Sequence, residues 1–259
     1  MIILLHSSKT MRTLPQTQAL QVPALRAQAQ LLATYVQSLD SQTLAKVMRI
    51  SPALADKTRQ TFANWTSDPA KQTAAIDSFV GDIYSGLRAS ELSPADRAYA
   101  QQHLFILSGL YGILCPFDGI QPYRLEMMYK FPTPPYDNLY HFWDRSVAKQ
   151  LPAQGPILNL AAIEYSKLIT PFVDESRLIT PRFLTHDPKT GEPTFVVVHA
   201  KIARGAFARW VIQNRVEHLD DLVKFGEIGY QYVPSLSTPT EPVFVCQEFG
   251  GKGLSMRLA

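Results

Sequence analysis

The sequence predicts an α+β protein with a mostly helical first half packed on a mixed β-sheet. Apolar residues recur at helical spacing from Leu25 to Leu39, which is typical of an amphipathic helix. Short apolar runs of the kind that form buried strands are concentrated after residue 156. No internal repeat, low-complexity segment or linker divides the 259 residues, so we expect a single domain over residues 1–259.

The chain begins with a short buried strand. Residues 1–5 are apolar and end at the polar turn 6–10, so the turn lies at the carboxyl end of a strand. Five apolar residues are too few for a signal peptide or a membrane span.

The two cysteines, Cys115 and Cys246, have no metal-type or disulfide-framework spacing, so we expect free thiols, no metal and a cytoplasmic protein.

Helical patterns dominate the first hundred residues. Ser51-Pro52 and Ser93-Pro94 each combine an N-cap residue with proline at the first helical position. The last of these helices is expected to lead into a hairpin at 108–112, and Pro116 limits any helix that follows it. The predicted helices cover residues 25–39, 41–50, 52–65, 72–80 and 94–106.

The second half changes in character after the stiff loop 132–136. Residues 139–151 form an amphipathic pattern, and one long helix is predicted from about Lys201 to Arg215. Strands are predicted at 157–160, 178–180, 194–199 and 243–246.

The charge balance restricts how the protein can bind anions. The 25 basic and 22 acidic residues give a net charge of only +3, which is too balanced for a protein that coats nucleic acid by bulk charge. Any anion site must therefore come from local clustering of lysine and arginine.

Two motifs resemble those of the YaaA peroxide-stress family. Residues 107–114 read Leu-Ser-Gly-Leu-Tyr-Gly-Ile-Leu, and residues 121–127 read Gln-Pro-Tyr-Arg-Leu-Glu-Met. The resemblance covers nearly the whole chain, with further matching segments at 48–51, 81–87, 139–143, 159–165 and 200–205.

The resemblance implies a compact mixed fold with a helix-hairpin-helix-like element, a positively charged cleft, DNA binding and a role in limiting damage by hydrogen peroxide.

The first loop departs from the family pattern. It reads His-Ser-Ser-Lys-Thr at 6–10, where the family usually has Ser-Pro-Ala-Lys-Thr, so Lys9 is the residue of this loop that we keep as a candidate.

The hairpin 108–112 is the first candidate DNA contact. Ser108, Gly109 and Gly112 could turn the chain tightly and leave backbone N–H groups facing phosphate oxygens, as helix-hairpin-helix units do. The alternative is an ordinary tight turn between packed helices, which needs no ligand.

The long helix is the second candidate contact. At 100° per residue Lys201 and Arg204 share one side, with Arg209 adding charge and Phe207 on the opposite side. The alternative is a solvated polar face. Together, hairpin and helix predict sequence-independent binding of double-stranded DNA, without a cofactor.

A second hypothesis is an enzyme that acts on a nucleotide or another phosphate-bearing small molecule. Arg124 could bind phosphate bidentately, or it could form a structural ion pair with Glu126. A deep pocket would favour this enzyme, and an open groove would favour DNA. The candidate catalytic residues are Lys9, Tyr123, Glu126, Glu164 and Lys201, with Arg124, Tyr165 and Arg204 completing the cleft.

Overall fold

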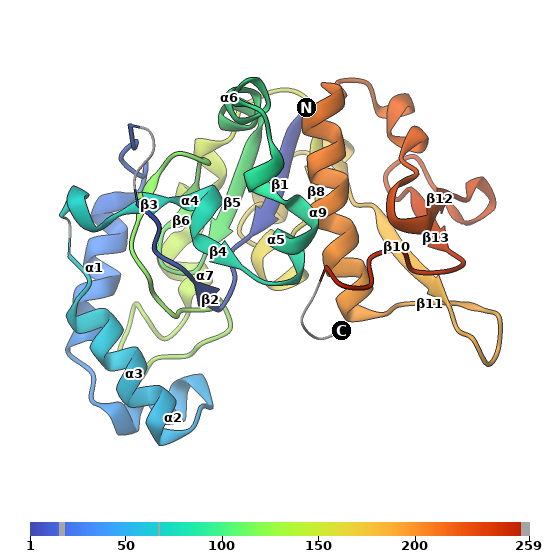
Figure 1. Cartoon of the computed structure of the whole chain (residues 1–259). Coiled ribbons are helices and arrows are strands. Elements are labelled where there is room, and N and C mark those ends of the chain that lie inside the picture. The colour runs from blue at the N-terminus through green and yellow to red at the C-terminus, as the bar shows by residue number, and fades with distance from the viewer. Residues whose placement is uncertain (16–18, 67, 255–259) are drawn as a thin grey trace.

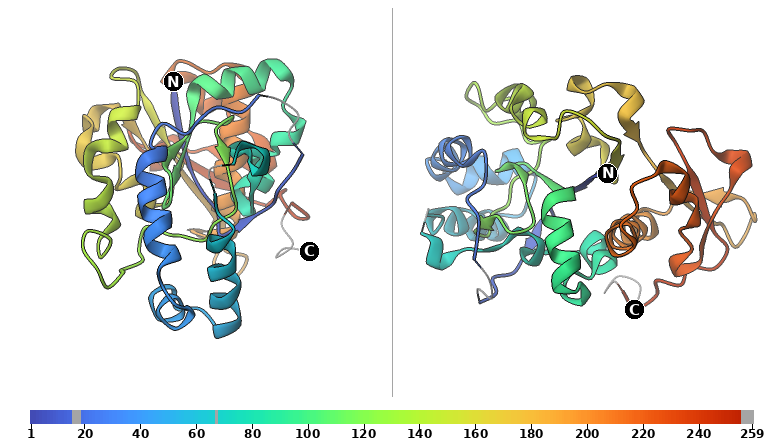
Figure 2. Two further views of the ribbon diagram at one scale, coloured as in Figure 1. Left: turned by 90° about the vertical axis from the view of Figure 1, so that its left-hand side faces the viewer. Right: turned by 90° about the horizontal axis from the view of Figure 1, so that it is seen from above.

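A computed structural model describes residues 1–15, 19–66 and 68–254 and has the predicted α+β class (Figure 1). Two sheets lie on either side of the long helix α9 (Val197–Asn214) (Figure 2). The first, called the cleft sheet here, has the strand order β6-β5-β1-β8-β9. The second, called the aromatic sheet, has the order β11-β10-β13-β12.

Most strands in both sheets are short. The cleft sheet contains β1 (Ile2–His6), β5 (Leu104–Ser108), β6 (Gly112–Leu114), β8 (Ile157–Asn159) and β9 (Leu178–Ile179). The aromatic sheet contains β10 (Arg182–His186), β11 (Pro193–Thr194), β12 (Tyr230–Tyr232) and β13 (Val243–Cys246). Two small antiparallel pairs join β2 (Thr10–Met11) to β4 (Phe79–Val80) and β3 (Thr73–Ala74) to β7 (Gly119–Ile120).

Helices cover both faces of the cleft sheet, with α5, α6 and α9 on one side and α7 and α8 on the other (Figure 2). Helices α1 to α3 form a lobe at the end of the molecule farthest from the aromatic sheet (Figure 1). The remaining helices are α1 (Arg26–Gln37), α2 (Ser41–Met48), α3 (Pro52–Ala63), α4 (Ala75–Ser78), α5 (Asp82–Leu87), α6 (Pro94–His103), α7 (Leu139–Trp143) and α8 (Ile163–Ser166).

Strand β1 is the centre of the cleft sheet, as its apolar sequence predicts. All five of its residues are buried, and it runs parallel to β5 on one side and to β8 on the other. A parallel strand covered on both faces needs apolar side chains on both, which explains the unbroken run Ile2–Leu5. The polar residues 6–10 therefore emerge at the carboxyl end of the central strand.

The aromatic sheet is held to α9 by stacked and edge-on rings. Phe207 of α9 lies 5.3 Å from Phe244 of β13 and 4.8 Å from Phe225, measured between ring centroids. Phe183 of β10 contacts the same cluster. Rings at these separations add to the free energy gained by burying their area, so this cluster fixes one side of α9.

Two glycines allow α5 and α9 to cross in close contact. A Cβ atom on Gly205 would lie 1.8 Å from the carbonyl oxygen of Ile83, and one on Gly86 would lie 2.0 Å from that of Ile202. Neither position can accept a side chain unless the helices separate. The crossing sets the position of Lys201 relative to the first turn of α5.

Several predicted elements are confirmed with shifts of a few residues. Helices α1, α2 and α3 occupy the first three predicted segments, and strands form at 157–159, 178–179 and 243–246. Ser51 caps α3 by accepting a hydrogen bond from the Leu54 N–H at 3.3 Å. Cys115 and Cys246 are free thiols, as expected.

The prediction of a helix over 94–106 leading into a helical hairpin was wrong in its last part. Helix α6 ends at His103, and Leu104–Ser108 is strand β5, paired with β1 and with β6. Residues 108–112 are thus the turn of a β-hairpin, and the helix-hairpin-helix-like element does not form there. A short apolar run fits a helix or a buried strand equally well, and pairing with β1 decides for the strand.

Three other segments differ from the prediction. Residues 73–80 form β3, α4 and β4 in place of one helix. Helix α7 ends at Trp143, where Asp144 has a φ of 40°. Val197–His199 begins α9 and does not continue a strand.

Candidate functional site

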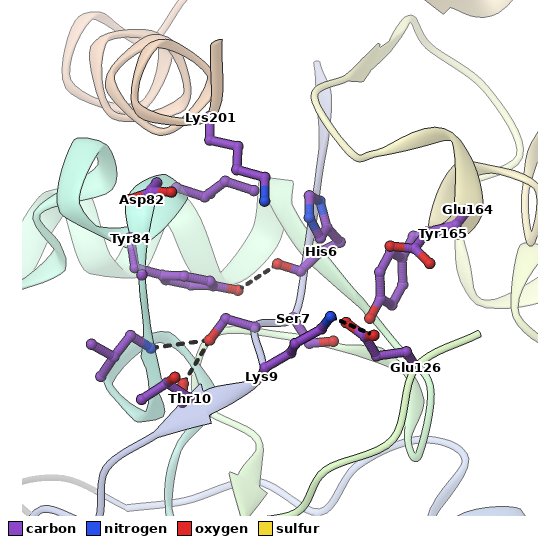
Figure 3. A pocket seen from close by; sticks show the side chains of 14 residues that line it. His6, Ser7, Lys9, Thr10, Asp82, Tyr84, Glu126, Glu164, Tyr165 and Lys201 are labelled. Carbon is purple, nitrogen blue, oxygen red and sulfur yellow. Dashed lines mark hydrogen bonds and ion pairs between the residues drawn. The ribbon is translucent and has the colours of Figure 1, made fainter. Parts of the chain in front are cut away.

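A cleft of about 300 Å³ opens where β1 ends, between α5, α8 and α9 (Figure 3). Lys201 reaches into it from α9, while Glu164 and Tyr165 enter from the α8 side, as Figure 3 shows. The lining comes from five separate parts of the chain: residues 6–10, 80–84, Glu126, 164–165 and Lys201. The carboxyl ends of parallel strands are a common place for binding sites in such sheets.

The loop after β1 is held in place by hydrogen bonds to α5 and β4. Tyr84 donates its hydroxyl proton to the carbonyl oxygen of His6 at 3.0 Å. Ser8 donates to the Thr10 carbonyl at 2.6 Å and accepts from the Val80 N–H at 3.2 Å. These contacts fix the direction in which Lys9 leaves the backbone.

Lys9 forms an ion pair with Glu126, with 2.9 Å between Nζ and Oε2. The Lys9 side chain is 53% exposed and that of Glu126 is 17% exposed. An ion pair this exposed contributes little to stability, about 0–1 kcal/mol, so its main effect is to hold the ammonium group at the cleft. Burial alternates along the 123–127 segment, with Tyr123 buried and Glu126 facing the cleft, as predicted for an extended chain.

Glu164 is the acidic group in the cleft whose protonation is altered. Burial raises the pKa of its carboxyl above the usual value, and the negative charge of Glu126 acts in the same direction. Lys9 and Lys201 oppose this rise. A half-buried carboxyl within electrostatic reach of two ammonium groups is suited to accept and return a proton.

Two buried tyrosines, Tyr84 and Tyr165, line the cleft, and a third, Tyr123, is linked to it through Ser7. Tyr123 and Tyr165 both hydrogen-bond to the side chain of Ser7, and Tyr123 lies 2.6 Å from Ser108 Oγ. Burial raises the pKa of Tyr84, Tyr123 and Tyr165 above that of a free phenol. These hydroxyls therefore stay neutral at physiological pH and can donate hydrogen bonds.

His6 also lines the cleft, and sequence reasoning did not select it. Its ring stacks on Tyr165 with 4.9 Å between centroids. Burial first, and then the charges of Arg204 and Lys201, lower the pKa of His6 to about 3. The position of His6 at the carboxyl end of an apolar strand was the signal that could have identified it.

Arg124 and Arg204 do not line the cleft directly. Arg204 is close enough to His6 for its charge to act on that ring, and burial lowers the pKa of its guanidinium. Arg124 hydrogen-bonds to Tyr129, and its Nε atom is buried without a partner among the described residues. Of the four basic residues that we expected around one cleft, Lys9 and Lys201 line it.

Arg209 is buried and held by ion pairs. It is 8% exposed and forms ion pairs with Glu227 and, at 3.9 Å, with Glu91. The sequence suggested that Arg209 adds charge to Lys201 and Arg204, but packing of α9 against neighbouring loops buries Arg209.

The hairpin residues are also buried. Ser108 is fully buried, and its Oγ accepts a hydrogen bond from the Tyr111 N–H at 3.0 Å. A Cβ on Gly109 would lie 2.4 Å from the Leu125 carbonyl oxygen, and Gly112 has a φ of +70°. These glycines are explained by close packing and a left-handed turn, which was the structural alternative.

A second, larger cleft of about 730 Å³ lies between α2 and residues 128–132. Helices α2 and α3 pack against each other and are joined by only three residues, Arg49–Ser51, with Arg49 in the left-handed region at φ 52°. Lys46, Arg49 and Lys130 line this cleft, and all three are exposed. A helical hairpin therefore does exist in the chain, between α2 and α3.

Within residues 1–15, 19–66 and 68–254 no group of three or more His, Cys, Asp or Glu side chains is arranged to hold a metal ion. In the same residues no helix combines the length and the apolar character needed to cross a bilayer.

Comparison with known proteins identifies the family. Residues 1–236 match the family model described as peroxide stress protein YaaA. A UPF0246 protein of Salinispora tropica is 62% identical over 258 residues, which are 99% of this chain and 98% of that protein. UPF0246 proteins of Roseobacter denitrificans (41% identity; 90% of this chain and 92% of that protein) and Shewanella piezotolerans (38%; 96% and 100%) also match. The chain therefore belongs to the YaaA peroxide-stress family.

Proposed function

We propose that the cleft at the end of β1 binds a small anionic molecule, such as a nucleotide or another phosphate-bearing compound, and acts on it as an enzyme. The observation that carries this proposal is the meeting of Lys9, Glu126, Glu164 and Lys201 from four distant parts of the chain in one cleft. Packing alone does not require such a concentration of ionisable groups in one place.

The proposed division of roles follows from charge and protonation. Lys9 and Lys201 attract the anion, while the neutral hydroxyl of Tyr165 donates to its oxygen atoms. Glu164 exchanges a proton with the bound molecule, because its raised pKa keeps it closer to neutrality than an ordinary carboxyl. No metal or cofactor is needed for this set of roles.

A binding screen tests this proposal. The purified protein is heated with nucleotides, sugar phosphates and small carboxylates, and the unfolding temperature is recorded. A ligand at 100 times its Kd adds about 2.7 kcal/mol of stability, which is a rise of roughly 5–10 °C for a chain of this size. Lys201→Ala should lose this rise, while Lys224→Ala, which removes an exposed lysine paired with Asp221, should keep it. Equal binding by folded Lys201→Ala would contradict the proposal.

A second candidate function is non-specific DNA binding by the α2–α3 hairpin. The specific observation that favours it is the exposed row Lys46, Arg49 and Lys130 beside a tight helical turn. Such a row can neutralise backbone phosphates without reading bases. The resemblance to the family, which implies a helix-hairpin-helix-like element, supports the same region.

DNA binding is separable from binding in the cleft. Each of Lys46→Ala, Arg49→Ala and Lys130→Ala should weaken binding to all duplexes alike and reduce the salt slope by about one unit. Lys201→Ala should leave that slope unchanged. A slope that depends on Lys201 and not on Lys46 would reverse the assignment of the two regions.

The physiological setting that we propose is the cytoplasmic response to peroxide, after the family's description. Two free thiols are compatible with a reducing compartment. A deletion strain complemented with Lys201→Ala or with Arg49→Ala should show which region protects cells from hydrogen peroxide, because the two substitutions affect different regions.

A further inference from the structure

The imidazole of His6 occupies a fixed place in the wall of the cleft. It is only 7% exposed, stacks on Tyr165 at an interplanar angle of 22°, and belongs to the last residue of the central strand β1. Figure 3 shows the ring between Lys201 and Tyr165. Stacking on Tyr165 holds the ring, and pairing with β5 and β8 holds the strand that carries it.

The hydrogen bond to the ring decides which nitrogen carries the proton. His6 Nδ1 lies 3.1 Å from the backbone nitrogen of Ala162, the residue that precedes α8. A backbone N–H can only donate, so Nδ1 must accept and must be unprotonated. In a neutral imidazole the proton then resides on Nε2.

The other ring nitrogen of His6, Nε2, is partly accessible. No hydrogen bond joins Nε2 to another described residue. Fully buried polar atoms without a partner, such as Arg124 Nε, do not include Nε2, so this atom is not fully buried. Because His6 lines the cleft, the accessible part of its ring is the part that a ligand meets. The Nε2–H group is thus available to a molecule bound beside Lys201.

The charges around the ring oppose a second proton. Lys201 and Arg204 of α9 are the charged groups that act on it most strongly, and both are cationic. Tyr84 and Tyr165 beside it are neutral. The other charged groups that line the same cleft are Lys9, Asp82, Glu126 and Glu164.

We propose that His6 is a neutral hydrogen-bond donor of fixed tautomer, whose Nε2–H binds an oxygen of a tetrahedral oxyanion held by Lys201. This inference rests on the proposed function of the cleft and adds one requirement to it. The ligand must present one oxygen to the ammonium group of Lys201 and another to an uncharged donor. A phosphate monoester or a related tetrahedral oxyanion meets that requirement, because several of its oxygens accept hydrogen bonds.

The tautomer is tested without any ligand. Nitrogen NMR of the full chain with ¹⁵N-labelled histidine distinguishes the two neutral tautomers from the cation, and a His6→Asn sample identifies the His6 signals. We expect the Nε2-protonated neutral form from pH 5 to pH 8. A signal of the Nδ1-protonated form, or of the cation in this range, would overturn the inference whatever the cleft binds.

The donor role is tested with sulfate, which keeps its charge of −2 across this pH range. His6→Asn retains an acceptor near the Nδ1 position for Ala162 but has no donor at the Nε2 position, whereas His6→Gln places an amide N–H near Nε2. Loss of a hydrogen bond to a charged oxygen should weaken sulfate binding about 10–100-fold in His6→Asn. The affinity of His6→Gln should stay within about fivefold of that of the unsubstituted protein.

Comparison with Lys201→Ala separates the two proposals. Sulfate binding that requires Lys201 but is equal in His6→Asn would overturn the role of His6 alone. Equal sulfate affinity of the unsubstituted protein and of Lys201→Ala would contradict anion binding in the cleft. The proposed role of His6 would then fail as well.

The pH dependence provides a last test. In a Glu164→Gln background, which removes the carboxyl whose pKa is raised, sulfate affinity should not rise as the pH falls from 8 to 5. A rise in that background would show that His6 gains a proton, and would overturn the inference.

Discussion

The two sheets beside α9 differ in what their side chains do. The cleft sheet is built from aliphatic strands and places polar groups where β1 and β8 end. The aromatic sheet contributes Phe183, Phe244 and Tyr230 to a ring cluster, and none of its strands lines the cleft described above. One sheet carries the candidate chemistry, and the other anchors the helix that brings Lys201 to it.

The largest effect on stability is expected where α5 and α9 cross. Gly205→Ala places a methyl group 1.8 Å from the Ile83 carbonyl oxygen, and no side-chain rotation relieves contact with a backbone atom. We expect a loss of more than about 4 kcal/mol in the free energy of unfolding, together with loss of ligand binding. Urea denaturation measures the first and the thermal screen the second. Gly226→Ala, where no atom lies within 4 Å of the added methyl, is the matched control and should stay near the unsubstituted value.

The aromatic sheet should affect stability alone. Phe244→Ala removes a fully buried ring from the cluster and should cost about 3 kcal/mol through lost burial and a residual cavity. Ligand affinity per folded molecule should be unchanged in calorimetry below the unfolding transition. A large change in that affinity, with α9 still folded, would mean that the aromatic sheet is part of the site.

Ser108 tests whether the buried hairpin is structural. Ser108→Ala removes the acceptor of the Tyr111 N–H and one of the two hydrogen-bond partners of the Tyr123 hydroxyl, which should cost about 1–3 kcal/mol. DNA affinity and its salt dependence should not change in the folded variant. A reduced salt slope would restore the hairpin as a DNA contact.

The smallest effect on stability is expected at Glu164, where the substitution should stabilise the protein and not destabilise it. Because the pKa of Glu164 is raised in the folded protein, its carboxylate form destabilises the fold at pH values above that raised pKa. Glu164→Gln should therefore raise the unfolding temperature at pH 8, and the gain should disappear as the pH falls below the usual carboxyl pKa. A lower unfolding temperature at pH 8 would show that the ionised form supports the fold.

Part of this difference between the sheets could be predicted from the sequence. Glu164 follows an apolar run that ends at a strand's carboxyl terminus, and strand position suggested it. Lys9 also follows such a run, but it was kept because it matches the family's loop. Helical spacing identified Lys201 as a candidate. It did not predict that Arg209 on the same helix is buried. Periodicity places charges around a helix, but only the tertiary contacts decide which of them are buried.

Other features depended on contacts that are distant in sequence. The segment 104–108 fits a helix by local pattern, and only pairing with β1 makes it a strand. His6 gained its importance from Ala162, more than 150 residues away. The departure of residues 6–10 from the usual family loop also left the loop's shape unpredictable until Tyr84 and Val80 were seen to hold it.

The central position of β1 has a consequence for how the protein is made. The ribosome produces this apolar strand well before its neighbours β5 and β8, which begin only at residues 104 and 157. At about 5–20 residues per second, β1 waits several seconds for its first partner and longer for its second. During that time Ile2–Leu5 is an unpaired strand on a nascent chain, which makes early synthesis the stage most exposed to aggregation and most dependent on chaperones.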